Sequence, residues 1–238
     1  MTLPRQRLRV FLADDHIILR QSLRAILEQN EFEIVGEASD GQAAIKMCET
    51  LRPEIAILDI GMPLLNGIDA AREIHKSCPE TKIILLTGFL DESYVLAGLR
   101  AGAIGYVVKG NTLSSLIRAI EAVSNSNTYL STEVTGTVVK AFFSNALPAA
   151  ADPLSARERQ VLQLIAEGQN MKEVGATLGI SRKTADSHRS RITQKLNIFN
   201  IAGLVRYAQK HRLIIDQTTD SNSEDEDVDG IQARNWRD

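Results

Sequence analysis

Short runs rich in β-branched residues alternate with stretches of helical periodicity through the first half of the chain. The runs are Arg9–Ala13, Glu33–Ala38, Ile55–Asp59, Lys82–Thr87 and Gly105–Val108, and the helical stretches are Ile17–Gln29, Gln42–Leu51, Ile68–Lys76, Tyr94–Ala101 and Leu113–Val123. Such alternation is typical of βα units around a parallel sheet. We therefore expect residues 1–125 to form a doubly wound α/β domain with five parallel strands.

Composition limits the class of protein. The chain has 238 residues, a length that suggests one large domain or two small ones, and its hydrophobic fraction of 44% is ordinary for a globular protein. No apolar run approaches the length of a membrane span, and a carboxylate pair interrupts the basic N-terminus before a signal sequence could form. Cys48 and Cys78 lack the close spacing of a zinc site. We expect a cytoplasmic protein with two free thiols and no membrane contact.

Charge is distributed unevenly along the chain. Residues 151–215 hold 11 Lys and Arg against 5 Asp and Glu, a net charge of +6. Residues 216–238 hold 2 against 8, a net charge of −6, and residues 1–130 hold 13 against 16, a net charge of −3. A basic block between acidic ones predicts that this block alone meets a polyanion.

The second half of the chain has a helical pattern. Residues 126–150 are expected to be a linker, with a possible helix over Thr132–Phe143. A capping box, Ser155 with Glu158, precedes the first helix of a four-helix domain over residues 151–215. Further helices are expected at Met171–Leu178, Arg182–Leu196 and Ile201–His211. The polar tail, residues 216–238, is expected to be disordered, although it could also compete with DNA for the basic helices.

Chemically distinctive side chains follow the predicted strands. Asp14 and Asp15 come after the first strand, and Asp59, Thr87 and Lys109 come at or after the ends of the third, fourth and fifth. In a parallel sheet these ends lie along one edge, where ligands bind. Carboxylates packed together need a cation, and oxygen ligands of this kind suit Mg²⁺.

Phosphoryl transfer to a carboxylate fits this set of groups. Asp59 would be the nucleophile, and Asp14 and Asp15 would hold the metal. Lys109 and Thr87 would stabilise the phosphoryl oxygens by charge and hydrogen bonding.

Residues 8–125 resemble the receiver domain of bacterial two-component response regulators. The resemblance rests on Asp14-Asp15, Asp59 followed by Met62-Pro63 and Gly67, Thr87, and Lys109. It implies a flavodoxin-like fold in which Asp59 accepts phosphate from a sensor histidine kinase. It also implies Mg²⁺ bound by Asp14, Asp15, Asp59 and the backbone carbonyl of Gly61. Tyr106 matches the family's switch aromatic, which turns inward when Thr87 moves toward the phosphoryl group; the residues alone favour a half-buried strand residue.

The basic segment has the plan of a helix-turn-helix. A short helix, a tight turn and a helix capped by Ser181 follow one another, and the second helix of such a motif enters the major groove of DNA. Helical stepping puts Ala185, His188, Ile192 and Leu196 on one inward face. The residues expected at the groove or at DNA phosphates are Arg182, Lys183, Asp186, Ser187, Arg189, Ser190, Arg191, Gln194 and Lys195.

Leu154–Asn197 is similar to the LuxR-type helix-turn-helix of the NarL/FixJ class of regulators. Matching stretches include Leu154-Ser-Ala-Arg-Glu-Arg159, Leu178-Gly-Ile-Ser181 and His188-Arg-Ser190. The chain departs from that pattern at Met171 and at Gly175, which should weaken its helix by up to roughly 1 kcal/mol. The resemblance implies dimer contacts on the last helix, for which the candidates are Leu204, Val205 and Ala208.

These observations together predict a non-enzymatic transcriptional regulator that phosphorylation at Asp59 switches. Its expected partners are a sensor histidine kinase, double-stranded promoter DNA, RNA polymerase and a second copy of the chain. One alternative is a DNA-binding regulator that does not respond to phosphate. Another is an aspartyl-phosphate phosphatase, which is disfavoured because Gly61 stands where such hydrolases carry an acid.

Overall fold

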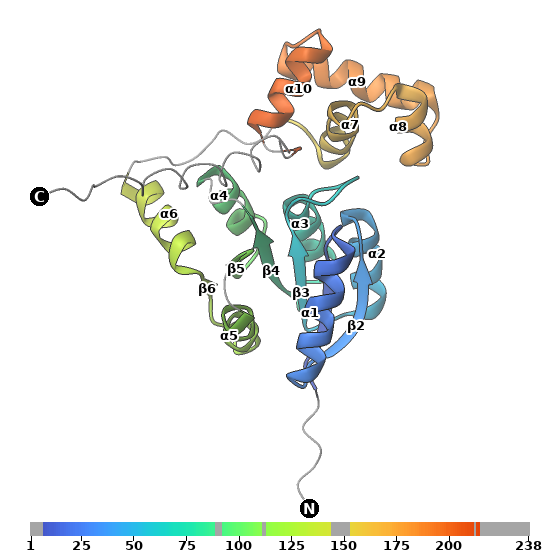
Figure 1. Cartoon of the computed structure of the whole chain (residues 1–238). Coiled ribbons are helices and arrows are strands. Elements are labelled where there is room, and N and C mark those ends of the chain that lie inside the picture. Colours follow the sequence, from blue (N-terminus) through green and yellow to red (C-terminus); the bar gives the residue numbers. More distant parts are fainter. Residues whose placement is uncertain (1–6, 89–91, 111–112, 144–152, 212, 215–238) are drawn as a thin grey trace, which may run out of the picture.

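The computed structural model describes residues 7–88, 92–110, 113–143, 153–211 and 213–214. Its N-terminal part is a parallel sheet between helices, and four further helices form a second body beyond one end of that sheet (Figure 1). The strands run in the order β2-β1-β3-β4-β5-β6, with every neighbouring pair parallel. Their bounds are β1 (Arg9–Ala13), β2 (Glu33–Ala38), β3 (Ile55–Asp59), β4 (Lys82–Thr87), β5 (Gly105–Val108) and β6 (Tyr129–Leu130).

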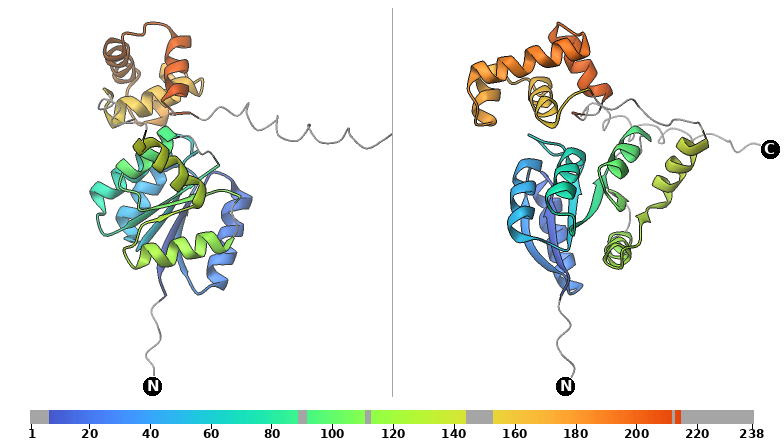
Figure 2. Two further views of the ribbon diagram at one scale, coloured as in Figure 1. Left: turned by 90° about the vertical axis from the view of Figure 1, so that its left-hand side faces the viewer. Right: turned by 180° about the vertical axis from the view of Figure 1, so that it is seen from behind.

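Helices cover both faces of the sheet, as Figure 2 shows from two sides. The helices of this part are α1 (Ile17–Gln29), α2 (Gly41–Leu51), α3 (Gly67–Ser77), α4 (Glu92–Arg100), α5 (Leu113–Ser124) and α6 (Thr132–Phe143). Buried residues of α1 and α5 share one hydrophobic cluster, and those of α2, α3, α4 and α6 share the other. The predicted doubly wound arrangement is therefore confirmed.

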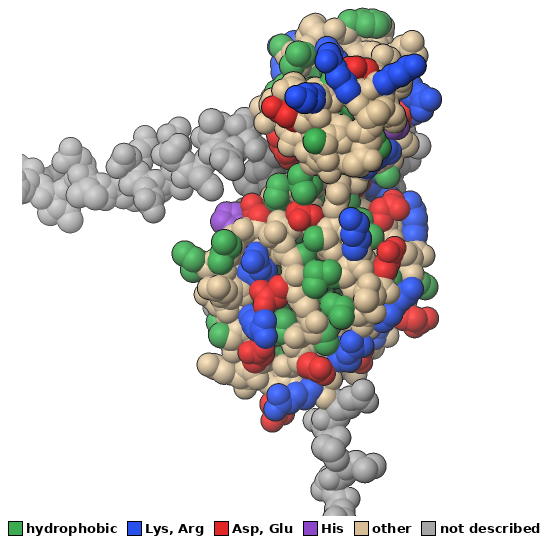
Figure 3. Space-filling view, turned by 90° about the vertical axis from the view of Figure 1, so that its right-hand side faces the viewer, with side chains coloured by type: hydrophobic (Ala, Val, Ile, Leu, Met, Phe, Trp, Pro, Cys, Tyr) green, Lys and Arg blue, Asp and Glu red, His purple; other side chains and the backbone are tan. Residues whose placement is uncertain are grey.

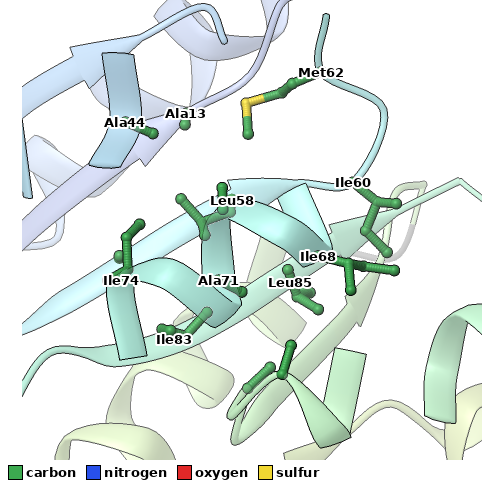
Figure 4. Packing of buried hydrophobic residues seen from close by; sticks show 14 of the residues in the cluster. Ala13, Ala44, Leu58, Ile60, Met62, Ile68, Ala71, Ile74, Ile83 and Leu85 are labelled. Atoms are coloured by element: carbon green, nitrogen blue, oxygen red, sulfur yellow. The ribbon is translucent and has the colours of Figure 1, made fainter. Parts of the chain in front are cut away.

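Alternation along β1 explains how one strand contributes to both clusters. Val10 and Leu12 point into the cluster under α1 and α5, whereas Phe11 and Ala13 point into the opposite one. Successive side chains of a strand face opposite sides of the sheet, so a strand covered on both faces must be apolar throughout. Figure 4 shows the larger cluster, in which Leu58 and Leu85 of the sheet pack against Ala71 and Ile74 of α3.

The expectation of five strands is wrong by one. Tyr129–Leu130 forms β6, which pairs with β5: Tyr129 N donates a hydrogen bond to Ile104 O (2.9 Å), and Ser131 N donates one to Tyr106 O (3.0 Å). Two residues are too few to show strand periodicity in a sequence. The possible helix over Thr132–Phe143 is present with the same bounds, and its Val134 is fully buried in the larger cluster. The packed domain thus continues past residue 125.

The C-terminal body contains α7 (Ala156–Ala166), α8 (Met171–Thr177), α9 (Arg182–Leu196) and α10 (Ile201–Lys210). The capping box of Ser155 and Glu158 is confirmed. A second box, Asn170 with Glu173, begins α8 and was missed, although its Asn-x-x-Glu spacing could have revealed it. Ser181 caps α9 by accepting a hydrogen bond from Thr184 N.

Gly175 has a packing reason that its helix propensity conceals. A Cβ at this position would lie 2.9 Å from the carbonyl oxygen of Ile180, in the turn that joins α8 to α9. The missing side chain therefore lets the turn approach α8 closely. Gly175 therefore weakens helix α8 by its low helix propensity, but it allows closer packing between α8 and the turn.

Three further expectations concern the chain as a whole. Cys48 and Cys78 are free, as predicted, and both are buried. Within the described residues, no helix is both long enough and apolar enough to cross a bilayer. The Pro-flanked part of the linker, residues 144–152, and the acidic tail lie outside the described residues.

Candidate functional sites

The carboxyl ends of three strands bring their charged groups into contact. Lys109, which follows β5, places its Nζ 2.8 Å from Asp14 Oδ2 and 2.9 Å from Asp59 Oδ1. Asp14 and Asp59 are only 2% and 4% exposed. The predicted convergence of these residues at one sheet edge is confirmed. Thr87, at the end of β4, is also buried, and its carbonyl oxygen accepts a hydrogen bond from Lys109 N.

Burial sets the electrostatics of this edge. It raises the pKa of Asp59, and the neighbouring Asp14 adds to the rise. The ammonium of Lys109 and a hydrogen bond from the backbone of Gly61 oppose it without cancelling it. Burial alone would lower the pKa of Lys109, but the two carboxylates together raise it. The lysine therefore stays charged, while Asp59 binds a proton more readily than an exposed carboxylate.

The edge has the donor set of a divalent cation site. One ligand atom each from Asp14, Asp15, His16 and Asp59 lies within 4.8 Å of the others. Asp14 Oδ2 and Asp15 Oδ1 are buried without an ordinary hydrogen bond, although each lies beside a cationic or imidazole nitrogen. Carboxylate oxygens gathered in this way fit Mg²⁺, which prefers hard oxygen ligands.

His16 is a member of this cluster that the sequence reasoning missed. Its Nδ1 lies 2.8 Å from Asp15 Oδ1 and 3.2 Å from Asp14 Oδ1, while the ring is largely exposed. Its place directly after the acidic pair was the signal that could have identified it.

Tyr106 lies inside the domain, three residues before Lys109. Its side chain is fully buried in the larger hydrophobic cluster, together with Tyr94 and Val95 of α4 and Val134 of α6. The half-buried position considered from sequence is therefore wrong. Helix α6 packs against both α4 and β5, the strand that carries Tyr106.

The loop after Asp59 reaches the C-terminal body, a contact that the sequence did not predict. Gln163 of α7 is 2% exposed; its amide nitrogen donates to Met62 O (3.3 Å) and its oxygen accepts from Asn66 N (3.2 Å). Leu64, at a left-handed φ of 63°, packs against the hydrophobic core of that body. Such a backbone conformation is unusual for leucine and is held by its surroundings.

Charged residues extend the same contact. Arg159 Nε of α7 donates to Asp69 Oδ1 of α3 at 2.9 Å, and Asp69 also pairs with Arg72. A cavity of about 230 Å³ lies between the two parts, lined by Asp15 and Gly61 on one side and by Gln163 and Glu167 on the other. The C-terminal body therefore lies directly beside the acidic edge.

The basic helix α9 presents the face predicted for it. Ala185 and Ile192 are fully buried, and His188 and Leu196 are half-buried, so the predicted inward face is confirmed. The predicted outward residues Lys183, Ser187, Ser190 and Gln194 are all exposed. Figure 3 shows Lys and Arg side chains gathered on the C-terminal body, while acidic and basic groups are mixed below it.

The remaining residues expected to contact DNA differ in their exposure and in their ion pairs. Arg182 and Arg191 are exposed, Asp186 and Arg189 are half-buried, and Arg182 Nε lies 3.7 Å from Asp186 Oδ2. Lys195 lies 2.6 Å from Glu158, a buried carboxylate of α7. Burial would raise the pKa of Glu158, but hydrogen bonds from Lys195 and Ser155 lower it to about 2. Lys195 therefore already joins α9 to α7.

The residues expected at a dimer contact need a correction. Leu204 and Ala208 are fully buried in the core of their own domain, and only Val205 keeps part of its surface. A domain of four short helices needs the apolar stripe of α10 for its own core. Large apolar residues that remain exposed at the start of α10 are Phe199, just before the helix, and Ile201, its first residue.

Comparisons with known proteins match the N-terminal and C-terminal parts of the chain to two different families of domain. Residues 10–121 match the pattern of the response regulator receiver domain, and residues 152–208 match that of bacterial regulatory proteins of the luxR family. The transcriptional regulatory protein MctR of Rhizobium johnstonii is 34% identical over 88% of this chain and 97% of its own length. The transcriptional regulatory protein LiaR of Bacillus subtilis is 36% identical over 87% of this chain and 99% of its own.

A solved structure resembles the whole arrangement. RcsB of Salmonella enterica serovar Typhimurium, bound to promoter rprA in the presence of the phosphomimetic BeF₃⁻, is 28% identical. The match covers 85% of this chain and 98% of that one, with a TM-score of 0.54. Another structure of RcsB contains two dimers bound to two parallel DNAs.

Proposed function

Given that the chain belongs to the response regulators that join a receiver domain to a LuxR-type DNA-binding domain, we propose that phosphorylation of Asp59 controls its binding to DNA. The observation that carries the proposal is the ion-paired edge, in which Lys109 bridges Asp14 and Asp59. A buried carboxylate with a fixed cation beside it is placed to accept a phosphoryl group.

In this proposal a sensor histidine kinase supplies the phosphoryl group from its phosphohistidine. An oxygen of Asp59 forms the new bond to phosphorus as the bond from phosphorus to the imidazole nitrogen breaks. Lys109 stabilises the charge of the phosphoryl oxygens, and the hydroxyl of Thr87 donates a hydrogen bond to one of them. Mg²⁺, held by Asp14, Asp15, Asp59 and the carbonyl of Gly61, supplies further charge neutralisation when it is bound.

The DNA-binding half acts through α9. Its exposed face carries Lys183, Ser187, Ser190 and Gln194 into the major groove, with Asp186 beside them. Arg182, Arg189 and Arg191 contact phosphates. RcsB is bound to DNA as dimers in one structure, and we extend a dimer on promoter DNA to this chain, together with contact to RNA polymerase.

Communication between the halves follows the loop after Asp59. That loop carries Gly61, a proposed metal ligand, and Leu64, which packs against the DNA-binding core. Gln163 holds the loop backbone at Met62 and Asn66. A phosphoryl group adds roughly −1.5 to −2 charges beside this contact. In this structure the loop contacts α7 while the groove face of α9 stays exposed. The contact between loop and α7 therefore controls where the DNA-binding domain lies and does not block the face that meets DNA.

Tyr106 takes part as the switch aromatic. Its inward position accompanies movement of Thr87 toward the phosphoryl group, and the ring is already inside in this structure. The inward Tyr106 ring is thus already in the position that a phosphoryl group on Asp59 stabilises.

Radiolabelled acetyl phosphate with Mg²⁺ tests the proposal on the full chain. Label should appear on the wild type and be lost in Asp59→Asn. Asp40→Asn is the matched control, because asparagine caps a helix as well as aspartate and Asp40 caps α2. Labelling that persists in Asp59→Asn would move the phosphoacceptor elsewhere.

A further inference from the structure

Gly98 lies where α4 packs closely against side chains of the sheet. It is buried on the side of α4 that faces β4 and β5. A Cβ built on this glycine would lie 2.5 Å from Leu85 Cδ1 and 2.9 Å from Tyr106 Cε2. Real Cβ atoms do not approach other heavy atoms so closely, so any side chain at this position requires a neighbour to move.

The two neighbours differ in how they can respond. Leu85 and Tyr106 are register partners on β4 and β5, so both lie under the same turn of α4. The methyl end of a leucine can change rotamer, whereas an aromatic ring is rigid and moves only by rotating as a whole. Tyr106 is fully buried among residues of α4 and α6, so it cannot move slightly without displacing them.

The ring is joined to the acidic edge through two short segments of strand. Tyr106 precedes Lys109 by three residues, and its partner Leu85 precedes Thr87 by two. The ends of these strands are tied by the hydrogen bond from Lys109 N to Thr87 O. A shift of the ring therefore acts on Lys109 and Thr87, the two residues that the proposed function places at the phosphoryl oxygens.

We propose that Gly98 is a positioning residue of the receiver: its missing side chain provides the space that the inward Tyr106 ring occupies under α4. A methyl group at this position displaces the ring and α4 from each other and so disfavours the phosphorylated arrangement. This inference rests on the proposed function, because it acts through Tyr106 and Thr87.

Fluorine NMR tests the structural half without any phosphodonor. The full chain, whose sequence has four tyrosines, is labelled with 3-fluorotyrosine, and the Tyr106 signal is assigned by its loss in Tyr106→Phe. Gly98→Ala should shift this signal toward a solvent-sensitive environment. Gly136→Ala is the matched control, because Gly136 lies in α6 with nothing within 4 Å of its absent Cβ. An unmoved Tyr106 signal in Gly98→Ala would overturn the inference.

Labelling by acetyl phosphate tests the functional half. Gly98→Ala should slow labelling of Asp59 roughly tenfold, because the added methyl group overpacks the space beside the Tyr106 ring, and Gly136→Ala should not. In a Tyr106→Ala background, where the ring is gone, the effect of Gly98→Ala should fall below about twofold. An equal slowing in both backgrounds would show a general disturbance of α4 and contradict the role of Tyr106.

Two outcomes separate this inference from the proposed function. If wild-type protein is not labelled at Asp59, the proposed function fails whatever the NMR shows. If the wild type is labelled and Gly98→Ala is labelled equally fast, only the inference fails. Should Gly98→Ala fold poorly, the same measurements are made with Leu85→Val added, which removes the contact at 2.5 Å and leaves the one with Tyr106.

Discussion

The acidic edge of the receiver and the groove face of α9 are built on opposite principles. At the edge, buried carboxylates lie within 3 Å of one lysine, so each charge is held by the others. On the groove face of α9, Lys183, Ser187, Ser190 and Gln194 are exposed, and the hydroxyls of the two serines donate to their own helix, at Lys183 O and Asp186 O. A site that changes its chemical state needs fixed, desolvated partners, whereas a surface that reads DNA must remain free until DNA arrives.

This contrast predicts that single substitutions act very differently in the two regions. Removing a member of the buried edge leaves the others unbalanced, because water cannot replace the lost partner. Removing a side chain from the exposed face costs little stability and changes only what the helix reads.

The largest effect is expected from Lys109→Ala. The change leaves Asp14 and Asp59 without their shared cation, so labelling by acetyl phosphate should fall on the order of a hundredfold. Burial already raises the pKa of Asp59, and loss of the lysine raises it further. Since only the ionised carboxylate attacks phosphorus, the remaining labelling should decline at a higher pH than in the wild type.

Lys46→Ala, an exposed change on α2, is the control for that experiment and should label normally. Equal labelling of Lys109→Ala and the wild type would remove Lys109 from the site.

Glu158→Gln tests the one contact of α9 described above that involves a buried carboxylate, the ion pair of Lys195 with Glu158. Its loss of charge weakens the bond to Lys195 and should destabilise the DNA-binding domain by about 2 kcal/mol at pH 7. The folded pKa of Glu158, about 2, lies below its ordinary value of 4.5. The stabilisation is therefore complete above about pH 4.5 and is lost as the pH falls toward 2.

Urea unfolding followed by hydrogen exchange of α7 and α9 measures this difference. Glu173→Gln is the matched control, because glutamine also completes a capping box at that exposed position. A Glu158→Gln protein as stable as the wild type at pH 7 would mean that Lys195 is free for DNA.

Ser187→Ala and Asp186→Ala should change sequence preference without changing stability. Each should alter discrimination by about 1–3 kcal/mol at one or two base pairs, measured by selection from a random DNA library. Their thermal unfolding should match the wild type, since neither side chain is buried. A selected sequence identical to that of the wild type would reject their place at the groove.

Arg189→Ala should have the smallest and least specific effect. Losing one phosphate contact weakens binding to all sequences and lowers the slope of log affinity against log salt by about one unit. Lys46→Ala, on the receiver, should leave the slope as it is. An unaltered slope in Arg189→Ala would place this side chain away from the phosphates.

Sequence periodicity was enough to predict five of the six strands and the residues of the acidic edge. The five predicted strands have the observed bounds, and because parallel strands end together, Asp14, Asp59 and Lys109 could be placed side by side. Periodicity also identified the inward face of α9 through Ala185 and Ile192.

The contacts that were missed depend on distance in the sequence. Nothing in the neighbourhood of Gln163 points to Met62, which is 101 residues away, because docking between domains leaves no local pattern. On α10, the same apolar spacing suits a core or a dimer face, and only packing showed that Leu204 and Ala208 belong to the core. Local sequence patterns therefore predict helices, strands and the residues at strand ends. Packing between these elements decides which apolar residues are buried in the domain core and which stay exposed.

The central claim is that the chemical state of Asp59 changes how α9 binds DNA. The direct measurement is a genome-wide map of DNA fragments bound by the full chain, with and without acetyl phosphate and Mg²⁺, for the wild type and for Asp59→Asn. The account predicts that the phosphodonor changes the occupancy of specific sites in the wild type and leaves the map of Asp59→Asn as it was. A wild-type map that ignores the phosphodonor, or an Asp59→Asn map that responds equally, would contradict it.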